Sequence, residues 1–262
     1  MSLLAELKVR SQVLEKVVDA CHEVLTEDDS ASEARKYLEG RMPRKSWRDY
    51  GLGYFPDDDN LDKLISLVGR KSLEEAGVLY PRFPFGIKGH YGDHNLLMPF
   101  RDVHGNIVAL LGRSLLPKDA RDELGLQKYK YSKGARKSLY VYGLDKAREA
   151  IIRKNSVIGV EGQFDCISCH LRGIHNVVAF GGADLSPYQF FQIHRYTNNI
   201  IVLMDNDEAG KKARKRICKN YNEYANIETA IPPKGYKDLD EFWREEKDQN
   251  WCRTVTEQLR SI

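Results

Sequence analysis

The chain has 262 residues, of which 42% are hydrophobic and 30% are charged, and its formal net charge at pH 7 is +3. These values are typical of a globular protein that buries a hydrophobic core, and they exclude a disordered or fibrous chain. No apolar run of about 18 residues occurs, and charged residues come too early for a secretory signal. We therefore expect a cytoplasmic protein with free cysteines and no membrane partner.

The first part of the chain is predicted to be helical and then mixed. Apolar residues recur at helical spacing in "LLAELKVRSQVLEKVVDACHEVL". A second helix is expected in "TEDDSASEARKYLEGRM", with Ser30 or Ser32 as its N-cap and Gly40 at its end. Two short helices follow, around residues 61–68 and in "SLEEAGVL". The two apolar runs of "HNLLMPFRDVHGNIVALLGRSLL", separated by a turn that contains Gly105, predict a β-hairpin.

From Tyr140 onward, strands and helices alternate. The predicted strands are "SVIGVEG", "NVVAF", "NIIVLMDND" and "IETAIPP", and the predicted helices between them are "FDCISCHLRG", "SPYQFFQIHRY" and "EAGKKARKRICKNY". Ser186 and Pro187 have the residue types favoured at an N-cap and at the first helical position. Such alternation predicts a mostly parallel sheet flanked by helices, with ligands at the carboxyl ends of the strands.

Acidic residues follow the ends of three of these strands. Glu161 follows the first strand, Asp205 and Asp207 follow the third, and Asp238 and Asp240 come soon after the fourth. A single acid in such a turn is more often a helix cap or a solvated residue. Several carboxylates crowded at one edge repel one another unless a cation neutralises them, and oxygen ligands suit Mg²⁺. The pattern predicts a divalent metal site.

The segment "VEGQFDCISCH" also ends in C-x-x-C-H, the pattern of covalent haem attachment. That chemistry belongs to exported chains, and no second cysteine pair completes a four-ligand zinc site. We therefore interpret Cys166 and Cys169 as small, partly buried residues on a helix to which His170 also belongs, and we expect neither haem nor zinc in this chain.

Two basic clusters stand out despite the small net charge. Basic residues alternating with tyrosines suit a surface that binds phosphates and stacks bases, although a solvated face is an equally good interpretation of either cluster alone. The clusters comprise Lys128, Lys130, Lys133, Arg136 and Lys137 in "QKYKYSKGARKSLY", and Lys211, Lys212, Arg214, Lys215, Arg216 and Lys219 in one predicted helix.

Two blocks in the C-terminal half, "VIGVEGQFDCISCHLRGIHNVVAFGG" and "IIVLMDNDEAGKKA", resemble the TOPRIM domain. This domain is shared by bacterial DnaG-type primases, type IA and type II topoisomerases and some nucleases. Three features of the resemblance point to primases. They are the E-G-x-x-D form of Glu161 and Asp165, the D-x-D-x-A-G form of Asp205, Asp207 and Gly210, and the later D-x-D of Asp238 and Asp240.

Blocks upstream resemble the same family. "EARKYLEGRMPRKSWRDYGLGYFPD" is similar to the start of the DnaG-type polymerase core, "LLMPFRDVHGNIVALLGR" to its hairpin and "QKYKYSKGARKSLYVYGLDKA" to its basic segment. The resemblance covers roughly residues 33–242. It implies an α/β fold in three parts: an N-terminal helical and mixed α/β basic subdomain over 1–150, a Rossmann-like TOPRIM domain over 151–235, and a C-terminal helical segment over 236–262.

The resemblance implies a DNA primase that makes short RNA primers on a single-stranded DNA template from nucleoside triphosphates. Asp205, Asp207, Asp238 and Asp240 would hold one or two Mg²⁺ or Mn²⁺ ions, which lower the pKa of the attacking 3′-hydroxyl. Glu161 would be a metal ligand or a general base. Asp165 would be an acidic residue next to the metal ligands that does not itself bind the metal. The implied catalytic residues are Glu161, Asp165, Asp205 and Asp207.

The resemblance also implies four basic residues that contact template or nucleotide phosphates, with Arg113 best placed for a bidentate contact. These residues are Arg101, Arg113, Lys128 and Lys137. No zinc ribbon precedes residue 33, and only about 20 residues follow the last acidic block. We therefore expect a bare polymerase core, either a fragment or a small phage-type protein. A replicative helicase and a separate zinc-binding template-recognition protein are its expected partners.

Two alternatives stay open at this point. A TOPRIM nuclease would use the same carboxylates to cleave DNA and would need no nucleoside triphosphates. A non-catalytic module would use the basic faces to hold single-stranded nucleic acid or to dock a helicase.

Overall fold

The computed structural model describes residues 3–81 and 87–262, which form two compact units. The first unit comprises Met1–Phe100 and Asn106–Ala135, and the second comprises Arg101–Gly105 and Arg136–Ile262. The second unit therefore includes residues on both sides of the expected limits at 150 and 235, which remain a prediction about family domains. Within the described ranges, every helix is too short or too polar to span a bilayer.

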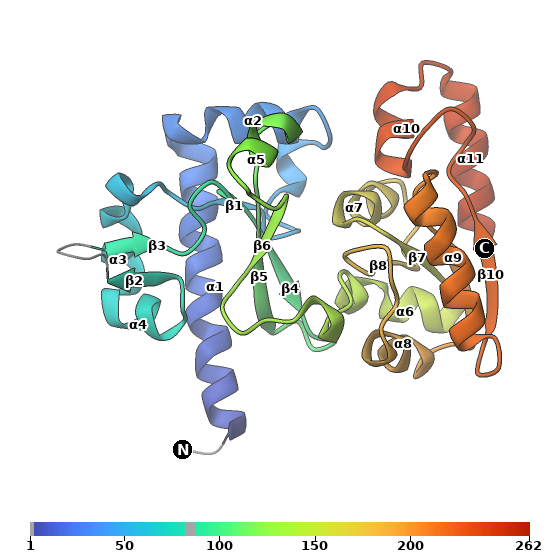
Figure 1. Ribbon diagram of the computed structural model, residues 1–262, viewed down its shortest axis with the longest axis horizontal. Helices are drawn as coiled ribbons and strands as arrows, with labels where there is room; N and C mark the ends of the chain where they lie inside the picture. Colours follow the sequence, from blue (N-terminus) through green and yellow to red (C-terminus); the bar gives the residue numbers. More distant parts are fainter. Residues whose placement is uncertain (1–2, 82–86) are drawn as a thin grey trace. The chain divides into compact units, whose positions relative to one another are not determined.

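The first unit is built on a long helix packed against an antiparallel sheet (Figure 1). Helix α1 (Leu3–Glu27) contacts strands β1 (Gly53–Tyr54) and β5 (Ile107–Arg113), and the sheet order is β1-β4-β5-β6. β4 (Leu96–Arg101) and β5 are neighbours joined by a turn in which the Gly105 N–H donates to the Asp102 carbonyl over 2.9 Å, which confirms the predicted hairpin. β6 (Tyr129–Tyr131) completes the sheet.

Shorter elements surround this core. They are the 3₁₀ turns η1 (Asp29–Ala31), η2 (Arg44–Ser46) and η3 (Asp58–Asn60), the helices α2 (Ser32–Glu39), α3 (Asp62–Val68), α4 (Arg70–Glu75) and α5 (Lys118–Glu123), and the paired strands β2 (Leu79–Pro81) and β3 (Ile87–Gly89).

The predicted start of the second helix was wrong, whereas Gly40 was correctly predicted as its C-cap. Neither Ser30 nor Ser32 is the N-cap. Asp28 accepts hydrogen bonds from the Ser30 N–H and hydroxyl over 2.9 and 2.7 Å and so caps the turn η1 instead. Because η1 runs directly into α2, the helix begins without a side-chain cap of its own.

The second unit contains the predicted parallel sheet, in the order β10-β9-β7-β8. Every neighbouring pair of these strands is parallel, which confirms the expected fold class. The strands are β7 (Val157–Val160), β8 (Val177–Ala179), β9 (Asn199–Leu203) and β10 (Asn226–Ala230).

Helices cover both faces of this sheet (Figure 1). Helices α6 (Leu144–Lys154), α8 (Pro187–His194) and α9 (Glu208–Tyr221) share one buried apolar cluster with the strands. Helix α7 (Gln163–Leu171) contributes no residue to that cluster and packs against β7, β8 and α10 (Leu239–Glu245). The β7–α7–β8 crossover runs one way along the sheet, and the β8–α8–β9 and β9–α9–β10 crossovers run the other way. Right-handed connections therefore place α7 on one face and α8 and α9 on the other. The turn η4 (Lys137–Leu139) and the helix α11 (Gln249–Ser261) complete the unit.

The predicted cap of α8 is confirmed. Ser186 accepts a hydrogen bond from the Gln189 N–H, the Gln189 side chain reaches back to the Ser186 N–H, and Pro187 is the first helical residue. This capping box fixes where the chain turns after β8.

Candidate metal centre

The register of the parallel sheet aligns the ends of its strands. Val160 of β7 pairs with Ala179 of β8 on one side and with Leu203 of β9 on the other. Glu161 therefore leaves the sheet beside the loop that follows β9, and its carbonyl accepts a hydrogen bond from the Gly181 N–H over 3.0 Å. Side chains in these loops share one edge of the sheet, as expected for the ligand-binding edge.

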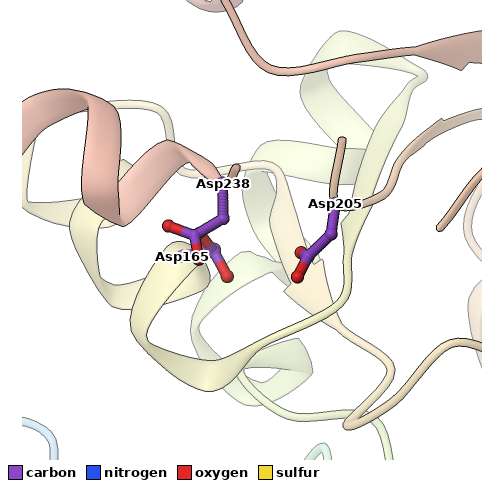
Figure 2. Close-up of side chains that lie close together, drawn as sticks. All are labelled: Asp165, Asp205 and Asp238. Atoms are coloured by element: carbon purple, nitrogen blue, oxygen red, sulfur yellow. The ribbon is translucent and has the colours of Figure 1, made fainter. Parts of the chain in front are cut away.

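Three carboxylates converge at this edge (Figure 2). Asp165 lies in the first turn of α7, Asp205 in the loop between β9 and α9, and Asp238 at the N-cap of α10. One oxygen from each lies within 4.8 Å of the others. We call Asp165, Asp205 and Asp238 the acidic cluster.

Asp165 is the most deeply buried member, with 7% of its surface exposed. Its Oδ1 accepts a hydrogen bond from the Asp240 N–H over 3.0 Å. Burial raises the pKa of this carboxyl well above its usual range, and the nearby charges of Asp238, Asp205 and Glu161 raise it further. These effects show that the site concentrates negative charge.

Two glycines of the acidic motifs allow the close approach of these groups. A Cβ at Gly162 would lie 2.7 Å from Oδ2 of Asp165, and a Cβ at Gly210 would lie 2.0 Å from the carbonyl oxygen of Asp205. Any larger residue would therefore displace one of the two aspartates.

Helix starts position the other acidic residues. Asp207 caps α9 by accepting from the Gly210 N–H over 2.9 Å, a bond that lowers the pKa of its carboxyl. Asp238 caps α10 by accepting from the Glu241 N–H over 2.7 Å. Burial raises the pKa of Asp205, against the opposing effect of the neighbouring Lys237 ammonium. Asp207 is exposed at the rim of the acidic cluster.

Asp240 does not face the acidic cluster, although its sequence spacing suggested a metal ligand. It is 3% exposed, and its two oxygens contact the Ser168 hydroxyl over 2.8 Å and the Arg244 Nε over 3.1 Å. Because residues two apart at a helix start point about 200° apart, Asp238 and Asp240 face different sides of α10. Among the described residues, Asp165 therefore takes the place in the cluster that the sequence interpretation gave to Asp240.

Lys237 is a site residue that the sequence interpretation missed. Its Nζ lies 3.2 Å from Oδ2 of Asp205 and 3.6 Å from Oδ2 of Asp207. Although burial lowers it, the carboxylates of Asp205, Asp207 and Asp238 together raise the pKa of this ammonium. Its position directly before Asp238 in "KGYKDLDEFW" is the sequence signal that could have indicated it.

The donor set fits a hard divalent cation. Three carboxylates supply oxygen ligands without sulfur or imidazole, and an ammonium already stands against two acids of this edge. Mg²⁺ and Mn²⁺ prefer such ligands, together with water and substrate phosphates.

Cys166, Cys169 and His170 lie on the helix α7, as predicted. Cys166, Cys169 and His170 are all buried, and the five cysteines of the chain are free. His170 Nε2 lies 2.9 Å from the Val177 carbonyl, and burial lowers the pKa of this imidazole to about 4. These contacts tie α7 to β8 and so help to fix the first turn that carries Asp165.

The four candidate phosphate-binding residues are divided between the two units. In the first unit, Arg113 Nη1 donates to the Tyr129 hydroxyl over 2.7 Å, and its guanidinium lies 4.9 Å from the centre of the Tyr37 ring. Lys128 Nζ lies 5.4 Å from the centre of the Tyr129 ring, and the Arg41 guanidinium lies 4.4 Å from that of Tyr37. Basic side chains and aromatic rings thus alternate along this part of the first unit.

In the second unit, Lys137 lies near the end of β8. Its Nζ is 3.2 Å from the point where a Cβ of Gly182 would stand, which places it at the edge of the sheet that carries Glu161. Arg101 Nη1 instead donates to the Gly105 carbonyl over 2.7 Å, within the hairpin turn.

Comparison with known proteins shows which families this chain resembles. Residues 21–148 match the family described as DNA primase catalytic core, N-terminal domain, and residues 158–243 match the family described as Toprim-like. The DNA primase of Aquifex aeolicus is 30% identical over 240 residues, covering 88% of this chain and 46% of that protein. The chain spans less than half the length of the first curated relatives it matches.

Solved structures of primase domains have a similar fold. The zinc-binding and RNA polymerase domains of the Aquifex aeolicus primase superpose with a TM-score of 0.77 at 26% identity, covering 98% of this chain and 62% of that one. A DnaG primase catalytic domain solved bound to single-stranded DNA has the same fold, with a TM-score of 0.75 at 23% identity, covering 97% and 80%. With two adjoining family matches and the acidic cluster at the expected edge of its sheet, the chain belongs to the DnaG-type primase catalytic cores.

Proposed function

We propose that the chain is a nucleotidyltransferase that synthesises short RNA primers on single-stranded DNA. The observation that carries this proposal is the convergence of Asp165, Asp205 and Asp238 at the carboxyl edge of a parallel sheet, in a chain of this family. Polymerisation of nucleotides requires a site that concentrates divalent cations next to phosphates, and this acidic cluster has that chemistry.

The residues of the edge take separate roles in the proposed reaction. Asp165, Asp205 and Asp238 hold Mg²⁺ or Mn²⁺, which when bound neutralises triphosphate charge and acidifies the 3′-hydroxyl. Glu161, beside the cluster, accepts the proton of that hydroxyl or serves as a further ligand. The 3′-oxygen then bonds to the α-phosphorus, the bond between the α- and β-phosphates breaks, and pyrophosphate leaves.

Two other acidic residues have supporting roles in the proposed reaction. Asp240 is a positioning residue, since its backbone N–H holds Asp165 and its side chain is occupied by Ser168 and Arg244. Asp207 fixes the start of α9 and lies at the rim, where it can join the ligands without leaving its cap.

Basic groups are proposed to hold the template in the first unit and the nucleoside triphosphates in the second. Arg113 and Lys128, interleaved with Tyr37 and Tyr129, supply phosphate contacts and aromatic surfaces on which bases can stack. Lys137 lies at the edge of the sheet that carries Glu161 and suits an incoming triphosphate. That a related catalytic domain was solved bound to single-stranded DNA supports a DNA template.

The test is extension of a short RNA annealed to a longer DNA template, with labelled nucleotides and Mg²⁺ or Mn²⁺. This format removes any requirement for start-site recognition. Asp205→Asn and Asp238→Asn are expected to lose template-dependent extension, whereas Glu223→Gln, which changes an exposed acid of the same unit, is expected to retain it. Full extension by either aspartate variant would overturn the proposal.

The same assay separates the two alternatives. Degradation of the DNA without added nucleotides would indicate a nuclease, and DNA binding that persists in EDTA without any extension would indicate a non-catalytic module. A replicative helicase and a zinc-binding protein supplied in trans remain predictions from the resemblance, and a cytoplasmic location remains a prediction from the sequence composition.

A further inference from the structure

Lys237 places a positive charge directly against the acidic residues of the candidate metal site. Its ammonium contacts Asp205 over 3.2 Å and Asp207 over 3.6 Å, so it lies against a member of the acidic cluster on the side of the rim. Ammonium ions and divalent metal ions compete for carboxylate oxygens, because both satisfy the same negative charge. Each cation on Asp205 weakens the binding of the other, because two positive charges held close to one carboxylate repel.

The backbone of Lys237 is fixed, whereas its side chain has room to move. Its carbonyl accepts from the Asn206 N–H over 2.7 Å, and its N–H donates to Oε2 of Glu241 over 2.5 Å. These bonds attach the residue to the loop between β9 and α9 and to the start of α10. The side chain itself is 53% exposed, so the ammonium can leave Asp205 for solvent without any change in the backbone.

We propose that Lys237 is a built-in counter-ion of the acidic edge, which partly neutralises Asp205 and Asp207 when no metal is bound and competes with a divalent ion for the charge of Asp205. The inference rests on the proposed function, because it takes the acidic cluster to be the metal site. It predicts that this lysine stabilises the metal-free protein and weakens metal binding at the same time.

The test uses Lys237→Met, which keeps a long side chain but removes the charge, and Lys234→Met as a matched control. Lys234 is an exposed lysine of the same loop. The readouts are the Mn²⁺ dissociation constant, measured by paramagnetic resonance of free Mn²⁺, and the melting temperature in EDTA and in Mn²⁺. Asp205→Asn identifies the fraction of binding that belongs to the cluster.

Lys237→Met is expected to bind Mn²⁺ roughly three- to tenfold more tightly than wild type, the range that one or two partly exposed ion pairs provide. It should also have a lower melting temperature than wild type in EDTA. Adding Mn²⁺ should raise its melting temperature more than that of wild type. Lys234→Met should change the affinity by less than half as much on a logarithmic scale.

Three results would overturn the counter-ion role. The first is unchanged or weaker Mn²⁺ binding by Lys237→Met. The second is an equal increase of Mn²⁺ affinity in both lysine variants, which would indicate only a nonspecific effect of net charge. The third is a melting temperature of Lys237→Met in EDTA that equals that of wild type. Failure of the proposed function has a different outcome, because wild-type protein would then show no Mn²⁺ binding that Asp205→Asn removes.

Discussion

Replacing Asp165 by Asn should stabilise the metal-free protein while removing metal binding. The carboxylate is 7% exposed and lies within 4.8 Å of the oxygens of two other acids. At that separation and an effective dielectric constant of about 20, two full charges repel by about 3 kcal/mol. Because the raised pKa of Asp165 lets protonation relieve part of this repulsion, we expect a gain of about 1–3 kcal/mol. The Asn carbonyl can still accept from the Asp240 N–H.

The assay is urea denaturation in EDTA and in saturating Mn²⁺, with Asp240→Asn as the contrasting variant. Asp240 is also buried, but Arg244 compensates its charge, so its replacement should cost about 1–3 kcal/mol. Asp165→Asn should raise the unfolding free energy in EDTA and show no further gain in Mn²⁺. A loss of stability in EDTA combined with a wild-type response to Mn²⁺ would refute the reasoning.

Three further perturbations test other parts of the structure. Gly210→Ala should destabilise the protein by about 2 kcal/mol or more and weaken Mn²⁺ binding, because the new Cβ meets the Asp205 carbonyl oxygen; calorimetry in EDTA checks this, and a neutral effect would contradict it. His170 has a folded-state pKa of about 4 against 6.5 for its ordinary value, so below about pH 6.5 the unfolded state takes up the proton first. Stability is then lost as the pH falls, by on the order of 3 kcal/mol down to about pH 4, and His170→Gln should lose that much less over the same range in urea titrations. Equal losses in both proteins would exclude this role for His170. Arg113→Gln should weaken binding of single-stranded DNA in fluorescence anisotropy and reduce the salt slope by about one, and an unchanged slope would remove Arg113 from the phosphate contacts.

The sheet of the second unit could be predicted because its local signals agree with its tertiary structure. The strands are short apolar runs, and the helices between them carry residues that start and stop them, such as Ser186 and Pro187. Parallel strands in register then bring the loops of Glu161 and Asp205 together without any further information. These facts alone predict which edge of the sheet carries the acidic residues.

The assignment of individual acids could not be predicted, because it depends on how α7 and α10 pack. Asp165 and Asp240 are both buried, and only the contacts of Asp240 with Ser168 and Arg244 show which of the two faces the acidic cluster. The cap at Asp28 was missed for a related reason, since the sequence does not show that a 3₁₀ turn precedes α2. Lys237 was missed because a single lysine in a loop has no periodic pattern.

The most direct test of the central claim is the anomalous-difference density of a crystal of this protein soaked in Mn²⁺. The account predicts a peak within coordinating distance of carboxylate oxygens from Asp165, Asp205 and Asp238, with the Lys237 ammonium moved away from Asp205. A peak at Asp240 without Asp165, or no peak at this edge of the sheet under conditions that support primer extension, would contradict it.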